Sequence, residues 1–187
     1  MRVIAGTARG RALKTLPSPA LRPTSGRVRA ALFSMLDSLE ADLSQILDLY
    51  AGTGSLGIEA LSRGAGEAVF VERDQRLCET IQTSLRKMGL VHRGRVVRMA
   101  VEQALKTLKG PFTLVVADPP YAQGEAVAHL TQVLVTSPAM AEGGLLAVEH
   151  PSRVDPGTGN LAGWARLRHR TYGDTGISIY RKERRLE

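Results

Sequence analysis

Five short apolar runs, separated by stretches with helical spacing, restrict this chain to an α/β fold. The runs lie at 46–50, 68–72, 95–99, 112–117 and 144–149, and the helical patterns lie at about 55–63, 75–88, 101–108 and 124–136. Short buried strands that alternate with helices imply βαβ units and a parallel sheet covered on both faces. After Pro151 two more strand-like runs, WARLRHR and GISIYR, meet at a turn near Gly173. The sequence therefore predicts a seven-stranded, mostly parallel sheet with a C-terminal antiparallel hairpin.

A glycine-rich turn follows the first apolar run. Gly52, Gly54 and Gly57 spell G-x-G-x-x-G between the first strand pattern and the next helix pattern. Glycines let the backbone come close to a ligand, and the N–H groups that open the helix attract an anionic group. Glu72 lies twenty residues after Gly52, at the end of the second run, where a carboxylate can accept both hydroxyls of a ribose. Together they predict a ribose-containing cofactor of open identity.

A second motif, Asp118-Pro119-Pro120-Tyr121, comes directly after the fourth run. The carboxyl ends of the strands line the ligand crevice of a doubly wound sheet, so Asp118 and Glu72 are expected to face one cleft. A carboxylate and the carbonyl of Pro119 can accept the two hydrogens of an exocyclic amine and stabilise the charge that grows on its nitrogen. Tyr121 can stack on an extruded base. The alternative is a strand-ending turn without chemistry, since Asp and Pro are good turn formers.

Positive charge is concentrated at the N-terminus. Residues 1–36 carry seven Lys or Arg and no acid, whereas the remaining residues carry 18 of each sign. Residues 2–17 predict a small β-hairpin arm, and a helix is expected from about Arg27 to Leu39, after a proline-rich linker. The expected division is an arm at 1–20 and one domain at 21–187. Such an arm suits phosphate binding, although a solvated arm without a partner is the alternative. The candidate nucleic-acid contacts are Arg9, Arg11, Lys14, Arg22, Arg27 and Arg29.

Several stretches together resemble the RsmD-type family. They are GTARGRALKTLP, LRPTSGRVRAALFSML, LDLYAGTGSLGIEALSRGA, VFVERD and YGDTGISIYR, and they cover nearly the whole chain. DPPY is shared with many methylases of amino nitrogens in nucleic-acid bases. The resemblance implies a Rossmann-like class I methyltransferase fold with S-adenosyl-L-methionine as cofactor. It also implies methylation of guanine N2 at position 966 of 16S rRNA, with that rRNA or the assembling small subunit as partner.

The resemblance further implies roles for single residues. Asp118, Pro119 and Tyr121 would hold the target amine and its base, the arm would grip RNA, and the segment 22–24 would border the cofactor. Relatives often place an acid or amide after the third strand to meet the adenine. This chain has Ala100 and Val101 there, so that contact would come from the main chain or from Glu102. The implied cofactor-binding residues are Thr24, Tyr50, Ala51, Gly52, Thr53, Gly54, Glu72, Arg73, Ala100, Val101 and Asp118.

Other functions remain open at this stage. An adenine-N6 methylase of DNA or RNA could use the same DPPY chemistry. An NAD-dependent oxidoreductase could use the glycine-rich turn and Glu72, but it leaves DPPY and the basic arm unexplained. An RNA-binding protein without catalysis could share the fold, although intact Asp118 and Glu72 argue against it.

Composition adds several expectations. The single cysteine, Cys78, excludes an intrachain disulfide and is typical of a reducing compartment, so a cytoplasmic location is expected. No apolar run approaches the roughly 20 residues of a membrane helix, and the N-terminus does not have the pattern of a secretory signal.

The four histidines show no metal-ligand spacing, so no metal is expected. A monomer is expected because no spare apolar helix face is evident.

Overall fold

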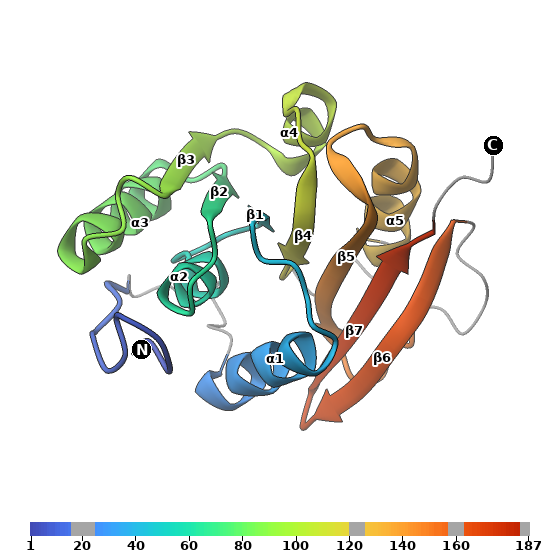
Figure 1. Ribbon diagram of the computed structural model, residues 1–187, viewed down its shortest axis with the longest axis horizontal. Helices are drawn as coiled ribbons and strands as arrows, with labels where there is room; N and C mark the ends of the chain where they lie inside the picture. Colours follow the sequence, from blue (N-terminus) through green and yellow to red (C-terminus); the bar gives the residue numbers. More distant parts are fainter. Residues whose placement is uncertain (16–24, 120–125, 157–162, 184–187) are drawn as a thin grey trace.

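The computed structural model describes residues 1–15, 25–119, 126–156 and 163–183. Within these residues seven strands form one sheet in the order β3-β2-β1-β4-β5-β7-β6 (Figure 1). The first five strands are parallel to one another, and β7 runs antiparallel to both β5 and β6. The strands are β1 (Gln45–Leu49), β2 (Glu67–Glu72), β3 (Gly94–Arg98), β4 (Phe112–Ala117), β5 (Met140–Pro151), β6 (Trp164–Tyr172) and β7 (Thr175–Lys182). The predicted fold class is confirmed.

Within the described ranges, five helices cover the two faces of the sheet. They are α1 (Gly26–Ser38), α2 (Ser55–Ser62), α3 (Gln75–Met88), α4 (Val101–Thr107) and α5 (Ala126–Thr136). Side chains of α1, α2 and α3 share one hydrophobic cluster with one face, and α4 and α5 share a second cluster with the other face. The alternation of strand side chains produces this division, since Ile46 of β1 lies in the first cluster and Leu47 in the second.

Local signals set the ends of α3, which the sequence predicted at the same bounds. Asp74 caps its start, because Oδ1 accepts hydrogen bonds from the N–H groups of Arg76 and Leu77 at 2.8 and 3.0 Å. Gly89, with φ +71°, ends it in the left-handed conformation. The strand β5 is longer than predicted and begins at Met140, which pairs with Phe112 before a register shift.

The strand β6, at one edge of the sheet, does not place its arginines as a regular alternation of side chains would. Arg166, Arg168 and Arg170 alternate along this strand and would share one face of a regular strand. The register shifts between Arg166 and Arg168, which pair with Tyr180 and Ile179 on opposite faces of β7. The interpretation as one row of three arginines is therefore wrong, because the bulge turns Arg166 to the other face.

Candidate active site and nucleic-acid interface

The strand register brings three predicted site residues to the carboxyl edge of the sheet. Leu49 of β1 pairs with Val71 of β2 and with Ala117 of β4. The next residue on each strand is Tyr50, Glu72 and Asp118, so these three lie at the same level. Glu72 and Asp118 are two strand spacings apart, about 10 Å, with the start of the glycine-rich turn between them.

The turn after β1 runs through left-handed backbone. Tyr50 and Gly52 both have φ +56°, and Gly54 has φ +75°. Gly54 is the N-cap of α2, and its N–H donates to the carbonyl of Ala51 at 2.7 Å. A Cβ built on Gly52 would meet only the Tyr50 carbonyl oxygen, at 3.9 Å. The loop is open at Gly52, and the first N–H groups of α2 follow directly, which suits an anionic group of a cofactor.

Main-chain amides fix the Glu72 carboxylate. Oε2 accepts from the N–H of Gly52 at 2.9 Å, and Oε1 accepts from Arg73 and Asp74 at 2.8 and 2.9 Å. A carboxylate offers roughly four acceptor positions, so Glu72 keeps capacity for a hydroxyl of a ligand. The same carboxylate thereby ties the end of β2 to the glycine-rich turn.

Asp48 belongs to the site and was missed in the sequence. It lies within β1, is 2% exposed, and accepts a hydrogen bond at Oδ2 from the N–H of Gly57 at 2.9 Å. Burial raises its pKa well above the ordinary value, and the charges of Asp118 and Glu72 raise that pKa further. This electrostatic coupling places the three acids near one another. The signal in the sequence was an acid inside an otherwise apolar run, ILDLY.

The third glycine of the motif serves packing. A Cβ on Gly57 would lie 2.4 Å from the ring of Phe70 and 3.0 Å from Oδ2 of Asp48. Only glycine lets α2 approach β1 and β2 this closely, and the approach forms the Asp48 hydrogen bond.

The start of α4 forms another wall beside the turn. Ala100 is the N-cap of this helix, and the side chain of Val101 is buried in the second hydrophobic cluster. A contact from Val101 to a cofactor would therefore use its main chain. Burial raises the pKa of Tyr50, the charge of Glu102 raises it further, and the charge of Arg73 lowers it.

Some predicted site residues lie outside the described residues, namely Arg22, Thr24, Pro120 and Tyr121. At the end of β4, Asp118 is half-buried and Pro119 is buried. Ala51 is buried and Thr53 half-buried on the turn.

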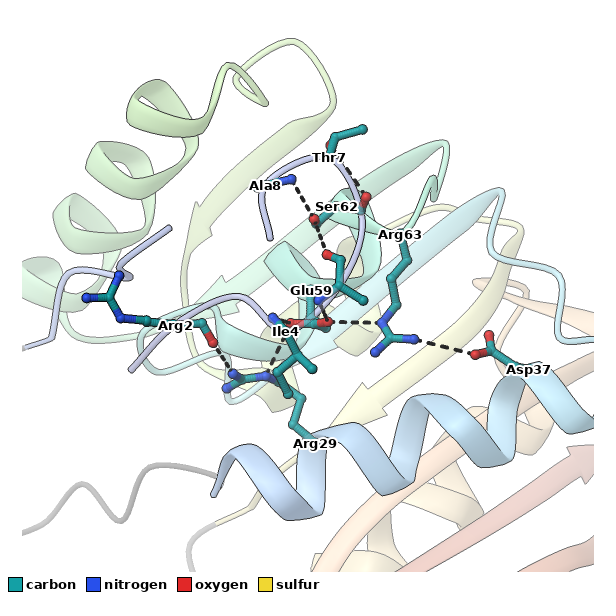
Figure 2. Close-up of polar contacts among 10 residues, drawn as sticks. Arg2, Ile4, Thr7, Ala8, Arg29, Asp37, Glu59, Ser62 and Arg63 are labelled. Atoms are coloured by element: carbon teal, nitrogen blue, oxygen red, sulfur yellow. Dashed lines mark hydrogen bonds and ion pairs between the residues drawn. The ribbon is translucent and has the colours of Figure 1, made fainter. Parts of the chain in front are cut away.

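The basic arm is held against α2 by two side chains (Figure 2). Glu59 is fully buried, and its two carboxylate oxygens accept from the N–H groups of Ile4 and Ala5 at 2.8 and 3.0 Å. Ser62 accepts from the N–H of Ala8 at 2.9 Å and donates to the carbonyl of Ala5. The predicted hairpin is short: Arg2 bridges to Ala12, and the N–H groups of Val3 and Leu13 donate to the carbonyls of Arg11 and Met1, each at 3.0 Å.

Arg29 does not belong to the nucleic-acid interface. It is 1% exposed, its Nε lies 3.4 Å from Oε2 of Glu59, and its Nη2 donates to the carbonyl of Arg2 (Figure 2). Burial lowers the pKa of Arg29, and the charge of Glu59 raises it. The prediction that Arg29 contacts nucleic acid is wrong, because the fold uses this guanidinium to hold the arm to α1.

Other predicted contacts are on the surface. Arg9, Arg11, Lys14 and Arg27 are exposed. Nη1 of Arg11 donates to the carbonyl of Lys87, in the last turn of α3, at 3.2 Å. Exposed cations on a docked arm can meet phosphates without first ordering the chain.

The described residues contain neither a metal-ion cluster nor a membrane-spanning helix. No group of three or more His, Cys, Asp or Glu side chains in these ranges is arranged to hold a metal ion. None of the described helices combines the length and apolar character needed to cross a bilayer.

The sheet order, with helices on both faces and acids gathered at the carboxyl edge of β1, β2 and β4, defines a class I methyltransferase fold. Residues 1–181 match the protein family described as Conserved hypothetical protein 95, and the chain belongs to that family.

Relatives cover nearly the whole chain. "Putative rRNA methyltransferase YlbH" of Bacillus subtilis is 37% identical over 97% of this chain and 99% of the relative. "Ribosomal RNA small subunit methyltransferase D" of Escherichia coli is 34% identical over 98% of this chain and 90% of the relative. These relatives confirm the resemblance seen in the sequence.

Solved structures share the fold. "Putative methyltransferase yhhF from Escherichia coli" has a TM-score of 0.84 at 32% identity and covers 98% of both chains. An RNA methyltransferase from Salinibacter ruber, in complex with S-adenosyl-L-homocysteine, has a TM-score of 0.68 at 17% identity over 88% of this chain and 96% of that chain. The second likeness concerns the fold alone.

Proposed function

We propose that this protein transfers a methyl group from S-adenosyl-L-methionine to the exocyclic N2 of a guanine, at position 966 of 16S rRNA. The observation that carries the proposal is the alignment of Tyr50, Glu72 and Asp118 at one level of the carboxyl edge. This alignment supports the assignment of Glu72 as a ribose acceptor and Asp118 as an amine acceptor on either side of one glycine-rich turn. The full-length relatives named as rRNA methyltransferases support the substrate class.

The cofactor assignment rests on the chemistry of the turn. Gly52 leaves the backbone open, the amides at the start of α2 suit a carboxylate, and Glu72 suits a ribose hydroxyl. S-adenosyl-L-methionine supplies a sulfonium methyl that is already activated for direct in-line transfer. Tyr50 to Gly54, Glu72 and Arg73 would hold it, with Thr24 at the border and the main chain of Ala100 and Val101 beside its adenine.

The reaction needs acceptors for an amine. The carboxylate of Asp118 and the carbonyl of Pro119 would accept the two N–H hydrogens and so direct the nitrogen lone pair away from the base and toward the methyl group. Asp118 would stabilise the positive charge that grows on the nitrogen as the N–C bond forms and the C–S bond breaks. S-adenosyl-L-homocysteine would leave, and the methylated amine would release one proton to water. Alignment of the amine nitrogen with the methyl carbon would account for much of the rate enhancement. Tyr121 would stack on the extruded base. No covalent intermediate with the protein is required.

The substrate assignment rests on the arm. Arg9, Arg11 and Lys14 present exposed positive charge on a segment fixed by Glu59, and Arg27 extends it to α1. Arg22 belongs to the same proposed surface. Neutralising Arg9, Arg11 and Lys14 together is expected to weaken binding of 16S rRNA and to flatten the dependence of affinity on salt. Unchanged affinity for 16S rRNA would mean that the RNA-binding site does not include these three residues.

The test is incubation of 16S rRNA with the protein and methyl-labelled cofactor, followed by mass-spectrometric mapping. Label on N2 of one guanine is expected, whereas label on adenine N6 would establish the rival methylase. The Asp118→Ala variant should lose at least a hundredfold in kcat while it keeps cofactor affinity by calorimetry, since the lost acceptor acts in the transition state. An active Asp118→Ala enzyme would refute the mechanism. Calorimetry with NAD is the control for the oxidoreductase alternative.

A further inference from the structure

A second depression lies at the opposite edge of the sheet from the candidate active site. Its volume is about 730 Å³, and the first residues of four strands line it, namely Gln45, Glu67, Gly94 and Phe112. The strand β1 has five residues, so this cavity is roughly 17 Å from the glycine-rich turn at the other end of that strand. The two sites are separate.

The cavity is positively charged. Arg86, Arg93, Arg95 and Lys109 line it, and Glu67 is the one acid among the described lining residues. Nη1 of Arg93 donates to the carbonyl of Ala65 at 2.9 Å, which fixes that side chain to the loop before β2. Arg86, Arg95 and Lys109 are exposed. A polar depression rimmed by exposed cations attracts anions rather than apolar groups.

The docked arm carries its charge to this cavity. Arg11 binds the carbonyl of Lys87, which is next to Arg86, and the N–H of Lys14 donates to Oγ of Ser84 at 3.4 Å. Figure 1 shows the arm beside α2 and α3. We name this surface the basic belt, and it consists of Arg11, Lys14, Arg86, Lys87, Arg95 and Lys109.

The same end of the arm also contacts α1. Arg2 bridges to Ala12, next to Arg11, and the carbonyl of Arg2 accepts from Arg29 in the first turn of α1. The arm therefore connects the start of α1 with the last turn of α3, and its exposed cations lie between these two helices.

We infer that the basic belt binds the phosphate backbone of an RNA segment that does not contain the target guanine. The inference rests on the proposed function, since it assigns a second contact to the same substrate. A nucleic-acid duplex carries a charge about every 1.7 Å of its axis, so a surface with several exposed cations can face several phosphates at once. The belt favours a large folded rRNA over a short fragment, because one segment must reach the belt while another enters the active site.

The experiment compares two triple variants with the unmodified protein. R86Q/R95Q/K109Q removes three exposed charges of the belt. K106Q/R170Q/R181Q is the matched control, because it removes three exposed charges from α4, β6 and β7. Equilibrium binding to full-length 16S rRNA is measured from 50 to 300 mM salt, beside methyl transfer, calorimetry with S-adenosyl-L-methionine and thermal unfolding.

The belt variant is expected to bind the rRNA at least tenfold more weakly than the control variant. Its plot of log affinity against log salt should be shallower by about 2, because each lost phosphate contact removes about 0.7 to 0.9 from the slope. The KM for rRNA should rise while kcat, cofactor affinity and melting temperature stay within twofold or 2 °C of the control. This split between KM and kcat separates a binding surface from damage to the fold.

Three outcomes would overturn the inference. If both triple variants bind alike while the unmodified protein methylates the rRNA, the inference fails and the proposed function stands. If the unmodified protein neither binds nor methylates the rRNA, the proposed function fails and the inference with it. If the belt variant is impaired on assembled small subunits but not on naked rRNA, the belt contacts a ribosomal protein instead.

Discussion

The N–H of Gly57, in the first turn of α2, donates a 2.9 Å hydrogen bond to Oδ2 of Asp48 in the middle of β1. This contact links the helix of the glycine-rich turn to a buried acid whose pKa is raised well above its ordinary value, first by burial. The folded state therefore holds this proton at pH values at which the unfolded chain releases it.

The pH dependence of Asp48 follows from that difference. Asp48 contributes fully to the free energy of unfolding below the pKa that it has in the unfolded chain, near 3.9. This contribution is lost as pH rises through the pKa of Asp48 in the folded protein. The loss is at most about 1.4 kcal/mol per pH unit. Asp48→Asn cannot ionise and can still accept from Gly57, so the variant should gain stability relative to the unmodified protein as pH rises. Urea unfolding from pH 4 to 8 measures the difference. The exposed Asp42→Asn is the control, and a difference for Asp48→Asn that does not change with pH contradicts the assignment.

Two glycines of the arm offer a matched pair. Gly6 and Gly10 both have φ +80°, but a Cβ on Gly6 would lie 1.8 Å from the carbonyl oxygen of Ser62, whereas one on Gly10 would meet nothing within 4 Å. Each alanine variant should lower the free energy of unfolding by about 1 kcal/mol, because alanine is strained in the left-handed conformation. Only Gly6→Ala should also displace the arm, breaking the 2.8 Å bond from the N–H of Thr7 to Ser62.

Limited trypsin digestion detects that displacement. Cleavage after Arg9 and Arg11 should be much faster in Gly6→Ala than in Gly10→Ala, because a released arm fits the protease. Equal cleavage rates would mean that the close approach of Gly6 to Ser62 does not hold the arm.

The buried pair of Glu59 and Arg29 predicts strong coupling. Both side chains are 1% exposed, so removal of Glu59 leaves the buried Arg29 guanidinium without its carboxylate. Removal of Arg29 leaves Glu59 paired with Arg63, whose Nε lies 3.0 Å from Oε1. Glu59→Gln should therefore cost about 3 to 5 kcal/mol and Arg29→Met less, and the double variant should cost less than the sum of the two. Chemical unfolding of the four proteins gives the coupling energy, and simple additivity would show that the pair is not an energetic unit.

A histidine pair predicts sensitivity to acid. The rings of His150 and His169 stack with centroids 5.5 Å apart, and Oγ of Ser178 lies 2.9 Å from Nε2 of His150 and 3.0 Å from Nδ1 of His169. Nδ1 of His150 lies 3.0 Å from the carbonyl of Pro151, which assigns the proton of the neutral ring to Nδ1. Nε2 then accepts from Ser178.

Burial lowers the pKa of His150, the charge of His169 lowers it further, and Asp155 raises it. The unfolded chain binds the proton more readily, so stability is present above about pH 6.5 and is lost as pH falls below it. His150→Asn should flatten this loss in thermal unfolding between pH 7.5 and 5, whereas His129→Gln, on the exposed face of α5, should not. Parallel curves for His150→Asn and the unmodified protein would refute the prediction.

Periodicity in the sequence was sufficient to predict the strands and helices of the sheet domain and their order along the chain, because the strands contain short apolar runs. Local signals at Asp74 and Gly89 also set the ends of α3. The glycine-rich turn and Glu72 were also accessible, since their spacing follows from one βαβ unit. Local patterns determine these features.

The features that were missed depend on partners far along the chain. Arg29 resembles a surface cation of a basic segment, and only Glu59, thirty residues later, makes it a buried residue. Asp48 has no local sign of its link to Gly57 beyond its apolar neighbours. The bulge next to Leu167 depends on the pairing of β6 with β7, so alternation alone placed Arg166 on the wrong face.

The attachment of the arm has a consequence for how such proteins can change. Glu59 and Ser62 bind the main chain of Ile4, Ala5 and Ala8, so these bonds do not depend on the charged side chains of the arm. Arg11 adds a side-chain contact to the carbonyl of Lys87, whereas the charges at Arg9 and Lys14 can change in evolution or by design without loss of these bonds. The attachment on α2 could therefore hold N-terminal segments of different sequence. Through such exchanges one catalytic domain could acquire new preferences among its targets.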